Sequence, residues 1–304
     1  PEINLVRIKM GNTGTDKDYK CVDWKDEKVK QIMLDNLNSK KEIDFSKIIG
    51  PQQYLSNCWF NTAMMCVFIS DKGRKFTRSM REDMINGNIS TNITKMGPII
   101  KTKRTLFMFN LIIDNALRGI LDIGINTNYI IQGLHSVNQL SKHFIKPGKA
   151  SNPISFLTNL QLILHQSNQL YIQKHTIETI NEKAISKFKE DFINKYVLYR
   201  LLSPIPDVFV VELYDDKSVD LNIKGKMLGL DWTDSTGKKH AATYTMTFDT
   251  HPLDGDKINY KLDSAVLRSN NKKHFVAFIT GNGKEYRFDG HTKSHLQPFE
   301  WKNY

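Results

Sequence analysis

The sequence predicts an α+β fold in which helices come first and an antiparallel β-sheet follows. Between residues 106 and 202, apolar residues recur three and four positions apart in four segments, which is the pattern of amphipathic helices. After Ser203 the chain changes to short apolar runs bounded by turn residues, beginning with VFVVEL at 208–213. The clearest signal is HFVAFIT, a GNG turn and KEYRFD, which predicts a hairpin over 272–289. Helices followed by strands are typical of α+β domains.

The same patterns divide the chain into an extension and one domain. Residues 1–50 are polar and mixed with one modest helical pattern, so we expect an N-terminal extension packed on the core. Residues 51–304 are expected to form a single domain, mainly helical over 51–203 and mainly β over 204–304. Residues 84–103 are rich in turn formers, which favours a surface loop there.

Composition limits the class of protein. The chain has 304 residues, of which 40% are hydrophobic, enough for the core of a globular protein. Its three cysteines are odd in number and form no CxxC pair, which argues against a disulfide framework or a Cys-rich zinc site. We therefore expect an intracellular protein of a reducing compartment, cytoplasm or nucleus. No apolar stretch approaches 18 residues, and we expect no membrane anchor.

The net charge of +11 is compatible with a nucleic-acid partner. The basic residues are scattered, however, with the densest runs at 72–81 and 101–104, and neither run belongs to a recognisable nucleic-acid module. A solvated basic face explains such runs more simply. A nucleic-acid-associated binding protein stays open as an alternative function.

The stretch PQQYLSNCWFNTAMM at 51–65 places a cysteine at the predicted start of a helix. Apolar residues recur at helical spacing after Cys58, and Ser56 and Asn57 are residue types that cap helix N-termini. The positive end of a helix stabilises a thiolate, the form in which cysteine acts as a nucleophile. Most apolar-flanked cysteines are core residues, and we assign Cys66 in this way.

The flank of Cys58 separates it from an ordinary core cysteine. The amide side chains of Gln52, Gln53 and Asn57 lie just upstream, where one of them could donate a hydrogen bond to a developing oxyanion. A cysteine nucleophile also needs a histidine base that is oriented by a third group. The expected catalytic residues on this side of the site are therefore Cys58 with Gln53 or Gln52.

The predicted hairpin supplies the other two groups. His274 opens its first strand and Asp289 closes its second, so antiparallel pairing would bring the two ends side by side. A carboxylate there holds an imidazole in one tautomer and stabilises its charged form. His240, His251, His291 and His295 are competing histidines. His291 and His295 are four apart, but they lie in a short polar tail that ends at Pro298 and has no acidic or cysteine partner. We expect no metal and no cofactor.

Three blocks of the sequence, at 50–62, 205–215 and 260–290, resemble the ubiquitin-specific proteases. GPQQYLSNCWFNT is similar to the cysteine box GLxNLGNTCYMNS of that family, with Cys58 on the nucleophile and Gln53 on the oxyanion-hole asparagine; Gln52 lies where the broader papain-like class has its glutamine. YKLDSAVLRSNNKKHFVAFI resembles YxLxAVxxHxGxxxxGHYxAYV, and EYRFDG resembles WYxFDD, which places His274 and Asp289 on the family's histidine and aspartate. IPDVFVVELYD is similar to the strand LPxVLxIxLKRF. The sequence departs from the family at Lys273, which replaces a glycine, and in lacking both GNT and the paired CxxC motifs.

The resemblance implies a papain-like cysteine peptidase fold, with a helical thumb, an antiparallel sheet as palm and the active site between them. It implies a thiol-dependent deubiquitinase that cuts after the C-terminal Gly-Gly of ubiquitin. Ubiquitin or a ubiquitin-like protein and ubiquitinated substrate proteins would then be its partners. A papain-like cysteine peptidase of other specificity, such as one that processes a ubiquitin-like modifier or a precursor protein, is the alternative within the same chemistry.

Overall fold

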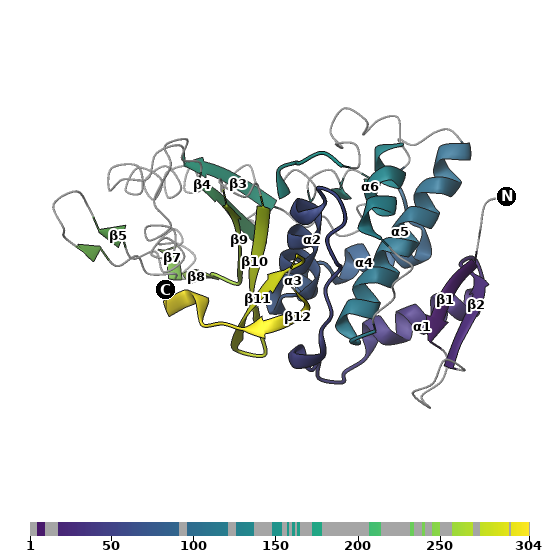
Figure 1. Cartoon of the computed structure of the whole chain (residues 1–304), viewed down its shortest axis with the longest axis horizontal. Coiled ribbons are helices and arrows are strands. Elements are labelled where there is room, and N and C mark those ends of the chain that lie inside the picture. The colour runs from purple at the N-terminus through teal and green to yellow at the C-terminus, as the bar shows by residue number, and fades with distance from the viewer. Residues whose placement is uncertain are drawn as a thin grey trace.

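The computed structural model describes residues 5–9, 18–90, 96–120, 126–136, 148–153, 157, 160–161, 163–164, 172–177, 207–213, 232–233, 239–240, 245–249, 257–269, 274–291 and 293–303. Helices α1, α4, α5 and α6 gather at one end of the molecule together with strands β1 and β2, the main sheet lies toward the other end, and helices α2 and α3 lie between them (Figure 1). The fold is α+β, as the sequence predicts.

The helical part contains six α-helices among the described residues. They are α1 Glu27–Asn38, α2 Cys58–Met64, α3 Asp71–Phe76, α4 Arg78–Asn86, α5 Met96–Leu117 and α6 Thr127–His135. The π-helical turn η3 Met65–Ile69 continues α2, and two 3₁₀ turns, η2 Phe45–Lys47 and η4 Trp301–Asn303, lie near the sheet. The sequence explains several ends: the Asp26 side chain accepts from the Lys28 amide to cap α1, and Gly87 ends α4 in a left-handed conformation with φ 70°.

The strands form one four-stranded sheet and four pairs within the described part. Their bounds are β1 Leu5–Lys9, β2 Tyr19–Asp23, β3 Ile172–Ile177, β4 Val208–Leu213, β5 Trp232–Thr233, β6 Lys239–His240, β7 Thr245–Asp249, β8 Lys257–Lys261, β9 Ser264–Ser269, β10 His274–Gly281, β11 Lys284–Asp289 and β12 Lys293–Pro298. The main sheet has the order β12-β11-β10-β9 and is antiparallel throughout. Asn282 and Gly283 both have positive φ at the β10–β11 turn, as an Asn-Gly hairpin requires, so the predicted hairpin is confirmed.

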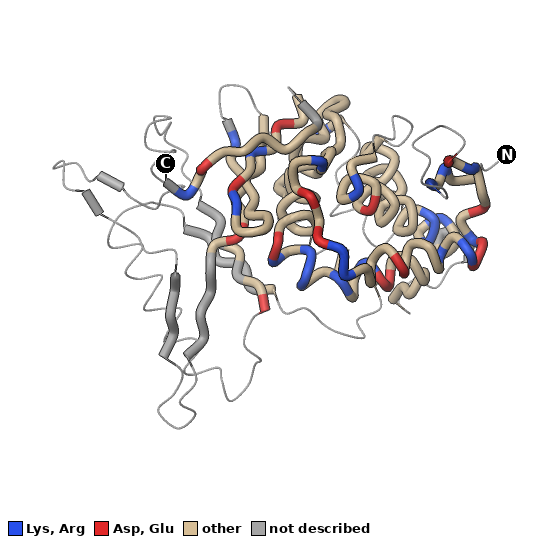
Figure 2. Tube along the Cα trace, turned by 90° about the horizontal axis from the view of Figure 1, so that it is seen from below, with Lys and Arg blue, Asp and Glu red and all other residues tan. Residues whose placement is uncertain are grey.

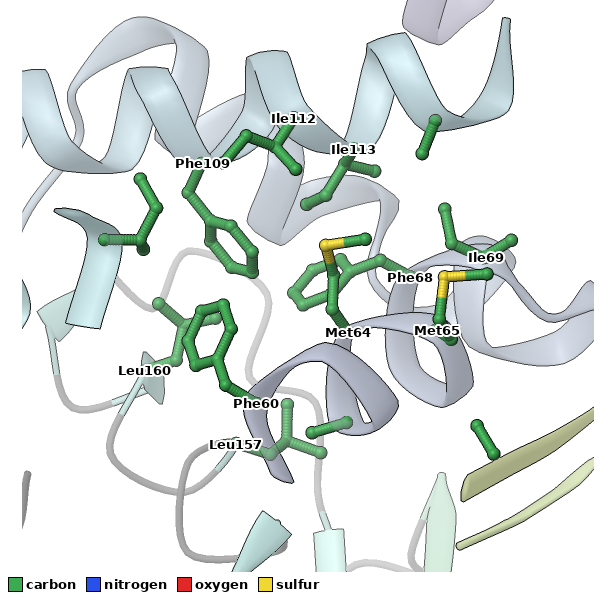
Figure 3. Close-up of a cluster of buried hydrophobic side chains, with 14 of the residues drawn as sticks. Phe60, Met64, Met65, Phe68, Ile69, Phe109, Ile112, Ile113, Leu157 and Leu160 are labelled. Carbon is green, nitrogen blue, oxygen red and sulfur yellow. The ribbon is translucent and has the colours of Figure 1, made fainter. Parts of the chain in front are cut away.

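Helix α2 lies at the centre of the protein, and all seven of its residues are buried. One side packs against strand β10. The other side packs on α5, where the Phe60 ring lies 5.4 Å from the Phe109 ring and Phe68, from η3, lies 5.3 Å from it. Figure 3 shows this cluster, with Leu157 and Leu160 beside Phe60. A helix whose residues are all buried must be enclosed on every side, and the two halves of the fold provide that enclosure.

Residues 42–50 connect the helical part to the sheet. The Ile49 amide donates to the Ala116 carbonyl at the end of α5 (3.2 Å), and Ile49 also forms a β-bridge with His295 of β12. Gly50 lies directly on the Phe288 ring, because a Cβ at this position would be 2.3 Å from that ring. The segment before the Cys58 loop is thus fixed to both halves of the protein.

A second, smaller core lies at strand β1, Trp24 and helix α1. Its members are Val6, Ile8, Trp24, Val29, Met33, Ile85, Phe107 and Leu111, so the β1–β2 hairpin and α1 pack on α4 and α5. The sequence predicts the helical pattern of α1 but not the β1–β2 hairpin.

Several expectations from the sequence are wrong. The expected loop at 84–103 contains the end of α4 and the start of α5, and Pro98 lies in the first turn of α5, where a missing N–H costs no hydrogen bond. The polar tail at 291–298 includes strand β12, which pairs with β11. β3 and β4 pair in parallel, not antiparallel. Of the helix expected over 176–202, the first two residues end β3 and 178–202 lie outside the described residues.

Charges of both signs are interspersed along the part of the chain that is drawn in colour in Figure 2. In the described residues, no helix has both the length and the apolar character needed to cross a bilayer.

The central position of α2 predicts a large effect of truncating its core. Phe60→Ala removes a ring that is 0% exposed and is expected to lower the free energy of unfolding by about 3–5 kcal/mol. Phe76→Ala, which truncates a phenylalanine that is 39% exposed, should cost less than about 1 kcal/mol. Urea unfolding measures both. Equal losses would contradict the enclosure of α2.

Candidate active site

Cys58 is the first residue of α2 and is 5% exposed. Its backbone N–H is one of the helix-start donors that have no partner inside the helix. Asn57 is the N-cap residue, but its side chain makes no capping bond to the helix. It accepts instead from the Tyr54 amide (3.0 Å) and donates to the Thr127 hydroxyl (2.7 Å). Asn57 therefore fixes the preceding loop and leaves the start of α2 open.

A buried polar network holds the loop at 51–57 in place. Thr127 of α6 donates its hydroxyl proton to Asn61 Oδ1 (2.7 Å). Asn61 in turn donates to the backbone carbonyls of Pro51 (3.3 Å) and Gln52 (3.2 Å). Buried amides need hydrogen-bond partners. In this loop conformation the side chains of Asn57 and Asn61 both have them. The backbone that leads to Cys58 is thereby positioned by α2 and α6.

His274 and Asp289 lie at the open end of the β10–β11 hairpin and are joined by a hydrogen bond. The register pairs Ala277 with Phe288, so the next step places Asp289 opposite Val276, two residues from His274 on the same face. His274 Nε2 lies 2.8 Å from Asp289 Oδ1. His274 is 7% exposed, and its Nδ1 is buried with no hydrogen-bond partner among the described residues. The Cys58 thiol thus makes no hydrogen bond to Nδ1 in this structure.

The electrostatics of Asp289 fix the tautomer of His274. Partial burial tends to raise the pKa of the Asp289 carboxyl, but hydrogen bonds from His274 and the His291 amide, with the charges of His274 and Arg287, outweigh it. The pKa therefore lies below its ordinary value, and the group is an ionised acceptor at neutral pH. An ionised carboxylate cannot donate, so His274 Nε2 must carry the proton. The lone pair of a neutral His274 is then at Nδ1.

Gln53 and Gln52 occupy different positions. The Gln53 amide N–H donates to the carbonyl of Gly290 (3.1 Å), the residue after Asp289, which fastens the Cys58 loop to the His274–Asp289 corner. The Gln53 side chain is half-buried and donates one amide proton to the Leu55 carbonyl (3.1 Å), which leaves its second amide proton available. The Gln52 side chain is exposed and accepts from the Tyr54 hydroxyl (3.0 Å).

Arg287 and His291, which are not among the predicted catalytic residues, also contact the His274–Asp289 pair. Arg287 Nη2 donates to Asp289 Oδ2 (3.2 Å), and the strand alternation that puts positions 287 and 289 on one face is the signal that could have found it. The His291 ring lies 4.4 Å from the His274 ring. In the described chain no three His, Cys, Asp or Glu side chains are placed to hold a metal ion.

The other two cysteines have different surroundings. Cys66 Sγ donates to the Ala265 carbonyl (3.6 Å) and burial raises the pKa of this thiol to about 12, so it is a protonated structural residue at neutral pH. Cys21 is exposed on β2. All three thiols are free.

No protein-family model and no curated protein sequence matches the chain. Among solved structures, the chain is similar to one of the SAGA Ubp8/Sgf11/Sus1/Sgf73 DUB module bound to ubiquitin aldehyde, with 13% identity, a TM-score of 0.49, and coverage of 85% of this chain and 67% of that chain. A second structure of the SAGA Ubp8/Sgf11/Sus1/Sgf73 DUB module is 12% identical with a TM-score of 0.37, covering 94% of this chain and 72% of the other. Both similarities are distant, so function must be argued from the residues of the site.

The lowered pKa of Asp289 predicts a pH-dependent contribution to stability. A carboxyl whose pKa is depressed by folding stabilises the protein above its unfolded pKa of about 3.9 and loses that effect as the pH falls through the folded value. Asp289→Asn should therefore reduce the free energy of unfolding at pH 7, and its difference from wild type should narrow below about pH 4. Asp35→Asn, at an exposed carboxylate of α1, serves as the control. A difference for Asp289→Asn that is constant from pH 7 to pH 3 would contradict the assignment.

Proposed function

We propose that this chain is a cysteine-dependent hydrolase that cleaves peptide or isopeptide bonds after the C-terminal Gly-Gly of ubiquitin. The observation that carries the proposal is the 2.8 Å bond from His274 Nε2 to Asp289, with a buried and unpartnered Nδ1. His274 begins β10, the strand that packs against the helix that begins with Cys58. A histidine oriented by a carboxylate, beside a helix-start cysteine, is the arrangement of an activated thiol nucleophile.

The first half-reaction uses all three side chains. His274 Nδ1 takes the thiol proton of Cys58, and the sulfur attacks the carbonyl carbon of the scissile bond. Asp289 stabilises the resulting imidazolium through its bond to Nε2 and keeps the ring from turning. When the tetrahedral intermediate collapses, His274 gives its proton to the departing amine and a thioester forms on Cys58.

The second half-reaction reverses the roles of His274. Water enters where the amine has left, and Nδ1 removes one of its protons as the oxygen attacks the thioester. The carbon–sulfur bond then breaks, the carboxylic acid product leaves, and the proton returns to Cys58. Atoms and protons balance over the two half-reactions with only the substrate, this chain and water.

The oxyanion would be bound by two donors from the Cys58 loop. The Cys58 backbone N–H has no helical partner, and Gln53 has one amide proton that is not used by Leu55. Gln53 is the better candidate than Gln52 because its backbone is fixed to Gly290 and its side chain is half-buried. Donors that are held in place before the reaction stabilise the developing charge most effectively.

The choice of ubiquitin rests on the three sequence blocks that resemble the ubiquitin-specific proteases. In this proposal residues 51–304 form the catalytic domain, and residues 42–50 support it by joining the sheet to α5. A reducing compartment would keep the three thiols free, as the mechanism needs for Cys58.

A labelling experiment tests both the nucleophile and the substrate. Ubiquitin that carries a thiol-reactive group at its C-terminus is expected to add once to the wild type and to Cys21→Ala, and not to Cys58→Ala, as measured by intact mass. An adduct that persists on Cys58→Ala would overturn the nucleophile. If the wild type forms no adduct while a small electrophile modifies Cys58 faster than Cys21, the substrate is another protein and the peptidase chemistry stands.

Steady-state turnover of a ubiquitin substrate distinguishes the roles of Gln53 and Gln52. Gln53→Ala should lower kcat by about 10²-fold, because it removes an oxyanion donor. Gln52→Ala, the matched control on the exposed side of the loop, should change kcat by less than about threefold. The reverse order of effects would assign the oxyanion to Gln52.

A further inference from the structure

The exposed ring of His291 packs against the buried ring of His274. The two ring centroids are 4.4 Å apart with an interplanar angle of 56°. His274 is almost fully buried, whereas His291 is exposed. The imidazole assigned to proton transfer is therefore in contact with a second, exposed imidazole.

The turn at residues 289–291 brings the His291 ring back to the His274 ring. Asp289 Oδ1 accepts from the His291 backbone amide (3.0 Å) as well as from His274 Nε2 (2.8 Å). The first bond closes a turn of two residues of the kind that aspartate favours. The same carboxylate oxygen thus fixes both the His274 ring and the backbone that carries the His291 ring.

Gly290 holds this turn against the Cys58 loop. A Cβ at position 290 would lie 3.3 Å from the Pro51 carbonyl, closer than a side chain ordinarily sits, and 3.5 Å from Gln53 Cβ. The Gly290 carbonyl accepts from the Gln53 amide (3.1 Å). The turn from 289 to 291 is consequently fixed on one side by Asp289 and on the other by the segment that leads to Cys58.

We propose that His291 is a positioning residue for His274. Its ring covers the solvent side of the His274 imidazole, keeps water from the bond between Nε2 and Asp289, and holds the ring in the plane that directs Nδ1 toward Cys58. The catalytic consequence rests on the proposed hydrolase function, whereas the contact and its shielding of the bond do not.

Ring shape is what this role requires. A phenyl ring at position 291 preserves the contact, because paired aromatic rings favour tilted packing at this separation. Alanine or serine removes it, while the backbone amide that bonds Asp289 remains in every variant. The comparison therefore isolates the ring from the turn. His295→Ala is a matched control, since His295 is an exposed histidine on the adjoining strand whose ring contacts no other ring in the described chain.

The first measurement is the exchange of the His274 Nε2 proton with water, followed by NMR on protein with labelled histidine. Slow exchange is expected in wild type, His291→Phe and His295→Ala, and exchange about tenfold faster in His291→Ala and His291→Ser. Rapid exchange already in wild type, no change in the ringless variants, or equal acceleration in His291→Phe would each overturn the proposal. This measurement decides the question even if ubiquitin is not a substrate.

The second measurement is turnover of ubiquitin that carries a C-terminal fluorogenic amide. His291→Ala and His291→Ser should lower kcat about tenfold with KM unchanged, as a loss of positioning predicts, and His291→Phe should restore it. A rise in KM alone, or a loss that phenylalanine does not restore, would contradict a positioning role. A wild type without turnover would count against the proposed function and leave the exchange result as the test of the contact.

Discussion

The complete burial of helix α2 is the constraint on which the rest of the structure depends. A seven-residue helix with no exposed residue is stable only if other elements cover every side, and here α5 covers one side and β10 another. Asn61 within α2 and Asn57 at its N-cap are buried amides that would destabilise the core if left unpaired. The Thr127 hydroxyl satisfies both. The burial that stabilises the fold therefore also fixes the conformation of the loop before Cys58.

The second fixed point is the corner at residues 289–291. Asp289 orients His274, and the Gly290 carbonyl accepts a hydrogen bond from the Gln53 backbone amide. The His291 ring packs against the His274 ring. Three consecutive residues thus join the hairpin to the Cys58 loop. Because the corner follows β11 and the loop precedes α2, the packing of α2 on β10 and the bond between Gln53 and Gly290 bring both parts of the candidate site to the same region of the fold.

Local patterns in the sequence were sufficient for the elements that carry the site. The helix that begins at Cys58 and the Asn-Gly hairpin that carries His274 and Asp289 are both local features, with strong periodic and turn signals. The Cys58 helix start and the α+β class were predicted for the same reason. The capping role expected for Asn57 failed because tertiary partners, Tyr54 and Thr127, compete for its side chain.

Features set by distant contacts could not be predicted. The sequence predicts a polar tail at β12 because an edge strand needs few apolar residues, and the pairing of β12 is decided by β11 and Ile49. The parallel pairing of β3 with β4 joins segments between which residues 178–206 lie outside the described part. The His291–His274 contact depends on a turn whose geometry is set by Asp289 and by the approach of Pro51. None of these contacts leaves a local pattern in the sequence.

The most direct test of the account is whether His274 activates Cys58. The rate of alkylation by iodoacetamide can be followed at each thiol by peptide mass, with exposed Cys21 as the internal reference. Cys58 is only 5% exposed, yet it is expected to be alkylated faster than Cys21 in the wild type. In His274→Asn the alkylation rate of Cys58 should no longer exceed that of Cys21. A Cys58 that reacts more slowly than Cys21, and at the same rate with or without His274, would contradict the account.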